Sequence, residues 1–74
     1  MKVKVKNRLY QMPRANYEKL LTVASEQVPF GIYAIEKNDY AELRKDKCSS
    51  MSQLKSLIRQ FKQQGFKVLS NNGR

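Results

Sequence analysis

Hydrophobic residues in this chain recur with two different periods, and the alternation between them predicts the order of the secondary-structure elements. Valines alternate with lysines from Lys2 to Lys6, the period-two pattern of a strand with one buried and one solvated face. Asn7-Arg8 is suited to a tight turn because asparagine tolerates positive φ. Residues 9–12 then return as a second strand, so the chain is expected to open with a β-hairpin.

A second hairpin is predicted in the middle of the chain. Residues 30–36 are rich in β-formers, residues 37–39 form a polar turn cluster, and residues 40–44 return as the partner strand. The polar segment that follows, up to Ser49, is expected to be a loop. Residues 66–69 predict a short closing strand.

Two segments have the spacing of amphipathic helices. The first is predicted over residues 14–27 and ends before Pro29, with a buried stripe of Tyr17, Leu20, Leu21, Ala24 and Val28. The second begins at Ser50, followed three residues later by Gln53 in a capping-box arrangement, and stops at Gly65. Its buried stripe consists of Leu54, Leu57, Ile58 and Phe61.

The expected order is therefore β-β-α-β-β-α-β, an α+β fold. Five short strands and two helices pack most simply as a small, mainly antiparallel sheet with both helices on one face. The opposite face of the sheet is then expected to be open or used for binding. Residues 1–69 are expected to form a single compact domain, and residues 70–74 a disordered tail.

Charge is distributed unevenly along this chain of 74 residues, whose net charge is +9. Residues 1–14 carry five basic side chains and no acid, and residues 47–74 carry six and no acid. Residues 15–46 hold all six acids against four basic side chains. If the two ends meet in space, they form a basic surface that attracts an anionic partner over long range.

The residues that catalysis most often needs are scarce. The chain has no histidine, and Cys48 is its one cysteine, so no metal site and no disulfide within the chain are expected. Lys45 and Lys47 could lower the pKa of the Cys48 thiol, but no base adjoins it. No phosphate-binding glycine motif is present. Three acids cluster at the second hairpin and suit solvated turn positions or partners for basic side chains: Glu36, Asp39 and Glu42. We therefore expect no enzyme activity, no catalytic residue, no metal and no cofactor.

The expected location is the cytoplasm. No apolar run follows the basic start, which argues against a signal peptide or a transmembrane helix. A lone cysteine fits a reducing compartment.

Two rows of basic side chains are the candidate binding residues. One row, on the first strand, is expected to project from a single strand face: Lys2, Lys4 and Lys6. The other lies at i, i+4 and i+7 on the second helix: Lys55, Arg59 and Lys62. Lysine and arginine neutralise phosphates, and tyrosines on an open sheet face stack bases, with Tyr10, Tyr33 and Tyr40 as candidates. The leading hypothesis is low-specificity binding of DNA or RNA through phosphate contacts.

The first half of the chain carries a resemblance. The residues are Val3-Lys4-Val5, Tyr10-Gln11-Met12-Pro13 leading into Tyr17-Glu18-Lys19-Leu20-Leu21, and Ile32-Tyr33-Ala34-Ile35-Glu36. In these the chain resembles small, basic, uncharacterised α+β proteins encoded by phages and prophages of low-GC Gram-positive bacteria. The resemblance implies an accessory protein that binds host or phage machinery.

The alternative function is therefore a phage or prophage accessory protein that binds and modulates a host or phage protein. Such a module would use its basic face against an acidic partner protein, or an exposed strand edge against the partner's sheet. A homodimer through an edge strand is a milder version. Binding to a membrane surface is disfavoured, because neither helix combines a wide apolar face with bulky exposed anchors.

Overall fold

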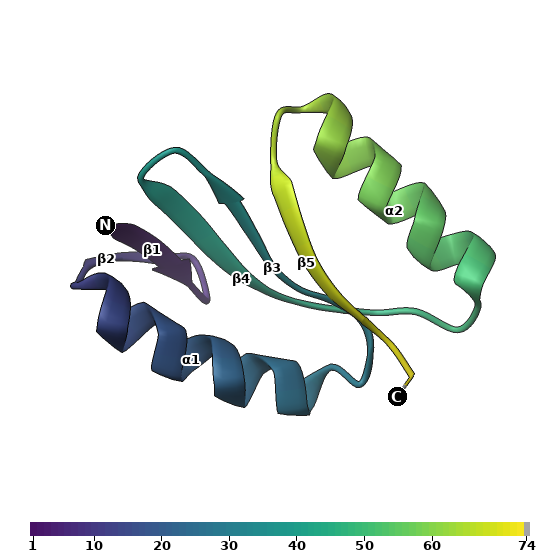
Figure 1. Cartoon of the computed structure of the whole chain (residues 1–74), viewed down its shortest axis with the longest axis horizontal. Helices are drawn as coiled ribbons and strands as arrows, with labels where there is room; N and C mark the ends of the chain where they lie inside the picture. The colour runs from purple at the N-terminus through teal and green to yellow at the C-terminus, as the bar shows by residue number, and fades with distance from the viewer. Residues whose placement is uncertain (74) are drawn as a thin grey trace.

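A computed structural model describes residues 1–73 and contains one five-stranded sheet and two helices (Figure 1). The elements are β1 (Lys2–Val5), β2 (Arg8–Gln11), α1 (Arg14–Gln27), β3 (Phe30–Lys37), β4 (Tyr40–Lys47), α2 (Met51–Gln63) and β5 (Lys67–Asn72). The predicted α+β class and the order β-β-α-β-β-α-β are confirmed. The first helix has the predicted limits. Strand β4 runs to Lys47, so part of the expected loop belongs to a strand. Neither described helix is long and apolar enough to cross a membrane.

The strands lie in the order β2-β1-β4-β3-β5. Three neighbouring pairs are antiparallel, as predicted, and the pair β1–β4 is parallel. The parallel contact is short, because β1 pairs with β4 only from Tyr40 to Glu42 whereas β4 continues to Lys47. The first hairpin is thus joined to β4 only through residues 2–4 of β1.

The turn of the first hairpin lies one residue earlier than predicted. Val5 pairs with Arg8, so the two turn residues are Lys6 and Asn7, with φ of 49° and 68°. Positive φ at both positions is typical of a type I′ turn, whose twist matches that of the flanking strands. With the turn at Lys6 and Asn7, all four residues of β1 pair with the four residues of β2.

The two helices pack on opposite faces of the sheet, which corrects the prediction that both lie on one face. Tyr17 of α1 packs with Val3 and Ala41, whereas Leu54 of α2 packs with Ile32 and Ile35. Figure 1 shows the sheet running between the two helices. We name its two sides the α1 face and the α2 face. No face is left entirely open, so the expected bare sheet surface is absent from the described residues.

Strand β3 contributes buried side chains to both faces of the sheet, because its apolar residues do not alternate with polar ones. The register of β3 shifts between Ile32 and Ala34 against both neighbouring strands. Against β5 this is a β-bulge with Tyr33 as the extra residue, whereas against β4 the extra residue lies in β4, between Leu43 and Asp46. The bulge places both Ile32 and Ile35 on the α2 face, three residues apart, and leaves Ala34 on the α1 face. A strand that is apolar on both sides is typical of a sheet covered on both faces.

The ends of α2 confirm the capping prediction. The Ser50 hydroxyl accepts a hydrogen bond from the Gln53 backbone N–H at 3.2 Å, and the Gln53 side chain accepts from the Ser49 N–H at 2.9 Å. At the other end, Gly65 has φ of 89° and its N–H donates to the Lys62 carbonyl. The Phe66 N–H donates to the carbonyl of Phe61, and the two rings pack edge to face, so the helix ends in a Schellman motif.

The C-terminal segment is ordered further than predicted. We expected a tail over residues 70–74, but β5 extends to Asn72 and pairs with β3 along its whole length. The Asn71 amide donates to the Ser25 carbonyl, the Ser25 hydroxyl and the Val28 carbonyl at 2.9–3.1 Å, which caps the C-terminal end of α1. Arg74, the last residue of the expected tail, lies outside the described residues.

Candidate nucleic-acid interface

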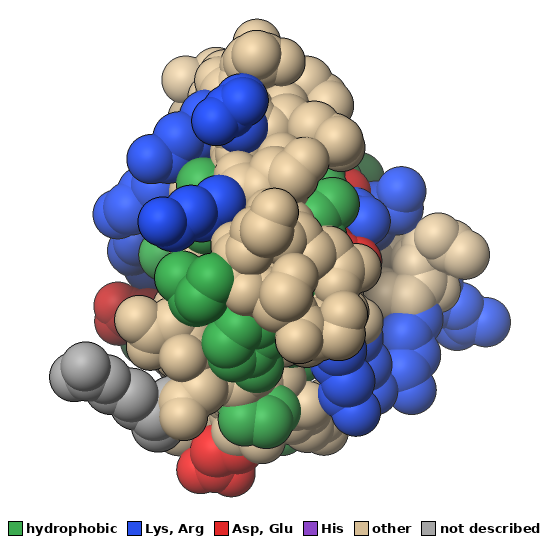
Figure 2. Space-filling view, turned by 90° about the vertical axis from the view of Figure 1, so that its right-hand side faces the viewer, with side chains coloured by type: hydrophobic (Ala, Val, Ile, Leu, Met, Phe, Trp, Pro, Cys, Tyr) green, Lys and Arg blue, Asp and Glu red, His purple; other side chains and the backbone are tan. Residues whose placement is uncertain are grey.

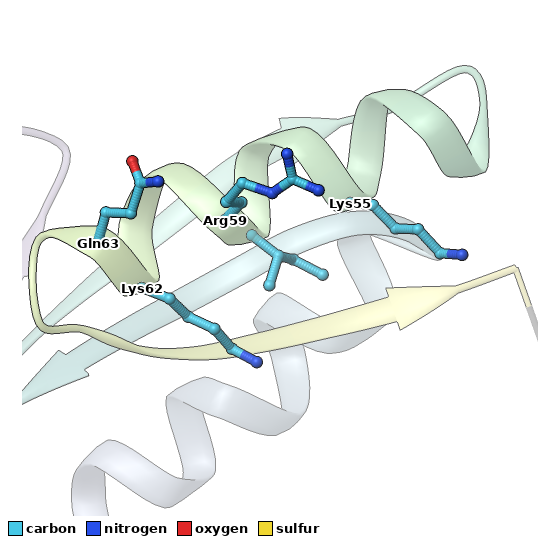
Figure 3. Close-up of a pocket in the computed structure, with 5 residues that line it drawn as sticks. Lys55, Arg59, Lys62 and Gln63 are labelled. Atoms are coloured by element: carbon cyan, nitrogen blue, oxygen red, sulfur yellow. The ribbon is translucent and has the colours of Figure 1, made fainter.

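Three basic side chains project from one flank of α2, and we name them the basic ridge: Lys55, Arg59 and Lys62. All three are exposed, and they spread outward from the same side of the helix together with Gln63 (Figure 3). The apolar stripe of α2, packed on β3 and β5, fixes the direction of this flank. The ridge therefore stands on a rigid element rather than on a loop.

The basic ridge carries uncompensated charge. Helix α2 contains no Asp or Glu, and within residues 1–73 no carboxylate lies within 4.0 Å of any ridge cation. Only Lys62 lies in the last turn of α2, where the helix dipole stabilises a cation. Like charges four residues apart cost a few tenths of a kcal/mol, and here no acid offsets that cost.

Two shallow hollows adjoin the ridge. One, of about 420 Å³, is lined by the three ridge residues with Ile58 and Gln63. The other, of about 430 Å³, lies nearer the start of α2 and adds Met51, Ser52 and Ser56 to Lys55 and Arg59. Both hollows are open to solvent and offer hydroxyl and amide donors beside the cations. Such groups contact phosphate and sugar oxygens in nucleic-acid complexes.

The lysines of the first strand do not join the ridge. The pairing of β1 with β4 places Lys2 beside Tyr40 and Lys4 beside Glu42, on the α2 face. Helix α2 covers β3 and β5, and its ridge flank faces the β5 edge of the sheet (Figure 3). Strands β4 and β3 therefore separate these lysines from the ridge. Figure 2 shows basic side chains in two areas with uncharged surface between them.

Lys6 departs from the other first-strand lysines. We expected Lys2, Lys4 and Lys6 on one strand face, but β1 ends at Val5 and Lys6 is a turn residue with positive φ. Its side chain lines a cleft beside α1, on the opposite side of the sheet from Lys2 and Lys4. The alternation that predicted one row therefore holds only as far as the strand continues.

The second hairpin neutralises part of its own charge. Arg44 donates from Nη1 to Glu42 and from Nε to Asp46, and its guanidinium lies 4.8 Å from the centre of the Phe61 ring. The hydrogen bond to Asp46 is the main cause that raises the pKa of Arg44, with the charges of Asp46 and Glu42 adding to it against the effect of burial. Arg44 therefore forms an ion-pair network with Glu42 and Asp46 within its own strand.

The three acids that cluster in sequence are separated in space. Glu36 lies on the α1 face and accepts a hydrogen bond from Tyr17, Glu42 lies on the α2 face with Arg44, and Asp39 is an exposed turn residue. No group of three potential metal ligands exists among the described residues.

Cys48 is half-buried, and its thiol donates to the Asp46 carbonyl at 3.7 Å. Burial, with a smaller contribution from the Asp46 charge, raises the pKa of the Cys48 thiol. The pKa shift is therefore opposite to the lowering that Lys45 and Lys47 could have caused, and burial is its main cause.

None of the three candidate stacking tyrosines adjoins the ridge. Tyr40 is half-buried on the α2 face and donates to Glu42 at 2.9 Å; burial and this hydrogen bond raise the pKa of its phenol. Tyr33 sits at the bulge beside α1. Tyr10 is exposed on edge strand β2, where its partner Val3 places it on the α1 face. Base stacking is thus not built into the ridge.

No protein-family model, curated protein or solved structure matches this chain.

Proposed function

We propose that this protein is a non-catalytic module that binds DNA or RNA with low sequence specificity through the basic ridge of α2. The observation that carries the proposal is a row of three exposed cations on one rigid helix flank, with no carboxylate of residues 1–73 within 4.0 Å of them. Along the helix axis the row spans roughly 10 Å, and phosphates on one strand follow at about 3.4 Å of helix axis. The ridge thus spans about three phosphate intervals, so each of its three cations can contact a phosphate of the same strand.

Low specificity follows from the side chains that are present. Lysine reaches phosphate as a point charge, and the ridge has one arginine and one neighbouring glutamine capable of bidentate contacts. None of the three candidate stacking tyrosines stands beside them. Phosphate contacts then supply most of the affinity, and such contacts position a protein without reading sequence.

The size of the interface predicts the salt dependence. Three phosphate contacts on duplex DNA give a slope of about −2.7 in log affinity against log salt. Affinity then falls about 40-fold between 50 and 200 mM salt. If Lys2 and Lys4 contributed equally, five contacts would give a fall of about 500-fold. The slope therefore distinguishes the ridge alone from a surface that combines both rows.

The test is fluorescence anisotropy of labelled single-stranded and duplex oligonucleotides, titrated with protein at both salt concentrations. The charge-reversed variant Arg59→Glu/Lys62→Glu should lose binding without unfolding, because both side chains are exposed. Its matched control is Lys2→Glu/Lys4→Glu, which changes the net charge by the same amount on β1. Equal loss in both variants would indicate diffuse attraction rather than a ridge, and no wild-type binding at 50 mM salt would remove the proposal.

A further inference from the structure

A cleft of about 420 Å³ lies on the α1 face, between α1 and the two strands β1 and β4. Five apolar side chains line it: Val5, Leu20, Val23, Ala24 and Leu43. Val23 is 52% exposed, although it sits on the helix that supplies much of the core. The cleft is thus an apolar surface that the fold leaves uncovered.

The cleft coincides with an interruption in the sheet. Strand β1 pairs with β4 only as far as Glu42 and then turns away at Lys6. Strand β4 continues from Leu43 to Lys47, and on its other side Leu43, Asp46 and Lys47 pair with β3. The described residues therefore provide no strand partner for this half of β4 on the side that β1 leaves. An unpaired strand edge of this kind accepts an added strand through main-chain hydrogen bonds.

The charge around the cleft is of one sign. Lys6 and Lys45 stand at its rim, and no Asp or Glu lines it. Neither lysine has a carboxylate within 4.0 Å among residues 1–73. Arg44 also lines the cleft, but its guanidinium is bound to Glu42 and Asp46 on the α2 face. The rim therefore favours an anionic occupant.

We propose that this cleft binds an extended peptide segment of a partner protein, which adds as a strand beside residues 43–47 of β4 in line with β1. The three observations select this occupant together. The free strand edge favours an extended backbone, the apolar lining favours a hydrophobic side chain, and the two lysines favour a nearby carboxylate. A second copy of this chain fits poorly, because its net charge of +9 and its lysine-bearing hairpin would face the same cations.

The register of β4 defines the pattern that the segment carries. Leu43 and Lys45 point to the α1 face, two residues apart along the strand. Side chains directly opposite each other on paired strands interact most closely. The bound segment therefore places an apolar residue opposite Leu43 and Asp or Glu opposite Lys45, with one residue between them. The proposal is independent of nucleic-acid binding, since the ridge lies on the other face of the sheet.

The test uses a random heptapeptide library displayed on phage, selected against the immobilised 74-residue chain. We expect enrichment of peptides with the pattern apolar, any residue, acidic. Synthetic copies are then titrated by anisotropy against wild-type protein and against Lys45→Glu and Val23→Lys, which alter exposed side chains and should fold normally. Both variants should weaken binding about tenfold or more, since one reverses a facing charge and the other places a cation in the apolar lining. Lys55→Glu is the control, because it makes the same charge change on the basic ridge.

Two further results bear on the site directly. Exchanging the acid of the peptide for lysine should abolish binding to wild type and restore it to the Lys45→Glu variant. Backbone amide shifts in ¹⁵N-labelled protein should concentrate at residues 43–47. The proposal is overturned if no peptide is enriched over the uncoated support, or if enriched peptides bind both cleft variants as tightly as wild type. Loss of oligonucleotide binding in a ridge variant with peptide binding retained would separate the two sites.

Discussion

The contact between Tyr17 and Glu36 joins α1 to the sheet, and its removal should be costly. The Tyr17 side chain is fully buried, and its hydroxyl donates to the Glu36 carboxylate at 2.6 Å. The Glu36 side chain is itself 12% exposed, with Arg14 at 3.9 Å as its other partner. The substitution Tyr17→Phe keeps the ring and removes the hydroxyl. It leaves a largely buried carboxylate with one distant cation.

The magnitude follows from the charge of the acceptor. A hydrogen bond to an ionised group contributes about 1.5–3 kcal/mol, so Tyr17→Phe should lower the free energy of unfolding by about 2 kcal/mol at pH 7. Urea denaturation followed by circular dichroism measures this directly. The double variant Tyr17→Phe/Glu36→Gln is the control, because it removes the buried charge that the single variant leaves unpaired. It should recover part of the lost stability.

The same contact predicts a dependence on alkaline pH. Burial, followed by the hydrogen bond to Glu36, raises the pKa of Tyr17 well above its ordinary value of 10.0. The phenol therefore ionises in the unfolded chain before it ionises in the folded protein. Its contribution is complete below pH 10 and is lost as pH rises further. At pH 11 the unfolded state gains about 1.4 kcal/mol from this ionisation.

The advantage of wild type over Tyr17→Phe should accordingly shrink from about 2 to about 0.6 kcal/mol between pH 7 and pH 11. Comparing the two proteins at each pH cancels the titration of lysines that both share. Equal stability at pH 7 would refute the energetic argument. An advantage that stays constant up to pH 11 would refute the assignment of a neutral, buried phenol.

Three further substitutions test the backbone and the C-terminal strand by urea denaturation. Gly31→Ala should lower the free energy of unfolding by about 3 kcal/mol, because Gly31 has φ of 148° and an added Cβ would lie 2.0 Å from the Asp46 carbonyl oxygen. Gly65→Ala, at a roomier site, should cost about 1 kcal/mol. Equal effects of the two substitutions would contradict this account. Asn71→Ala should cost about 1–3 kcal/mol, because it removes the hydrogen bonds that cap α1, and an unchanged midpoint would show that β5 does not fasten this helix.

Part of the candidate site followed from the sequence alone. The spacing of Lys55, Arg59 and Lys62 beside an apolar stripe predicted a row of cations on one helix flank, because helical periodicity is a local property. The cleft was not predicted. Val23 lies outside the expected stripe of α1, and Lys45 was placed in a loop. A valine outside the apolar stripe of an amphipathic helix is the sequence signal that could have indicated this surface.

Sequence by itself determined which segments fold as strands and helices, where α1 begins and ends, and how Ser50 caps α2. These features depend on neighbours a few residues apart, where side-chain period and capping chemistry decide the outcome. Tertiary structure decided that β1 pairs with β4, that the helices lie on opposite faces, and that the two basic rows stay apart. The apolar run in β3 indicated burial on both sides, but the bulge that directs Ile32 and Ile35 to α2 arises from pairing with two strands distant in sequence. Such long-range register is set by packing of the whole sheet, and it placed the charges on separate surfaces.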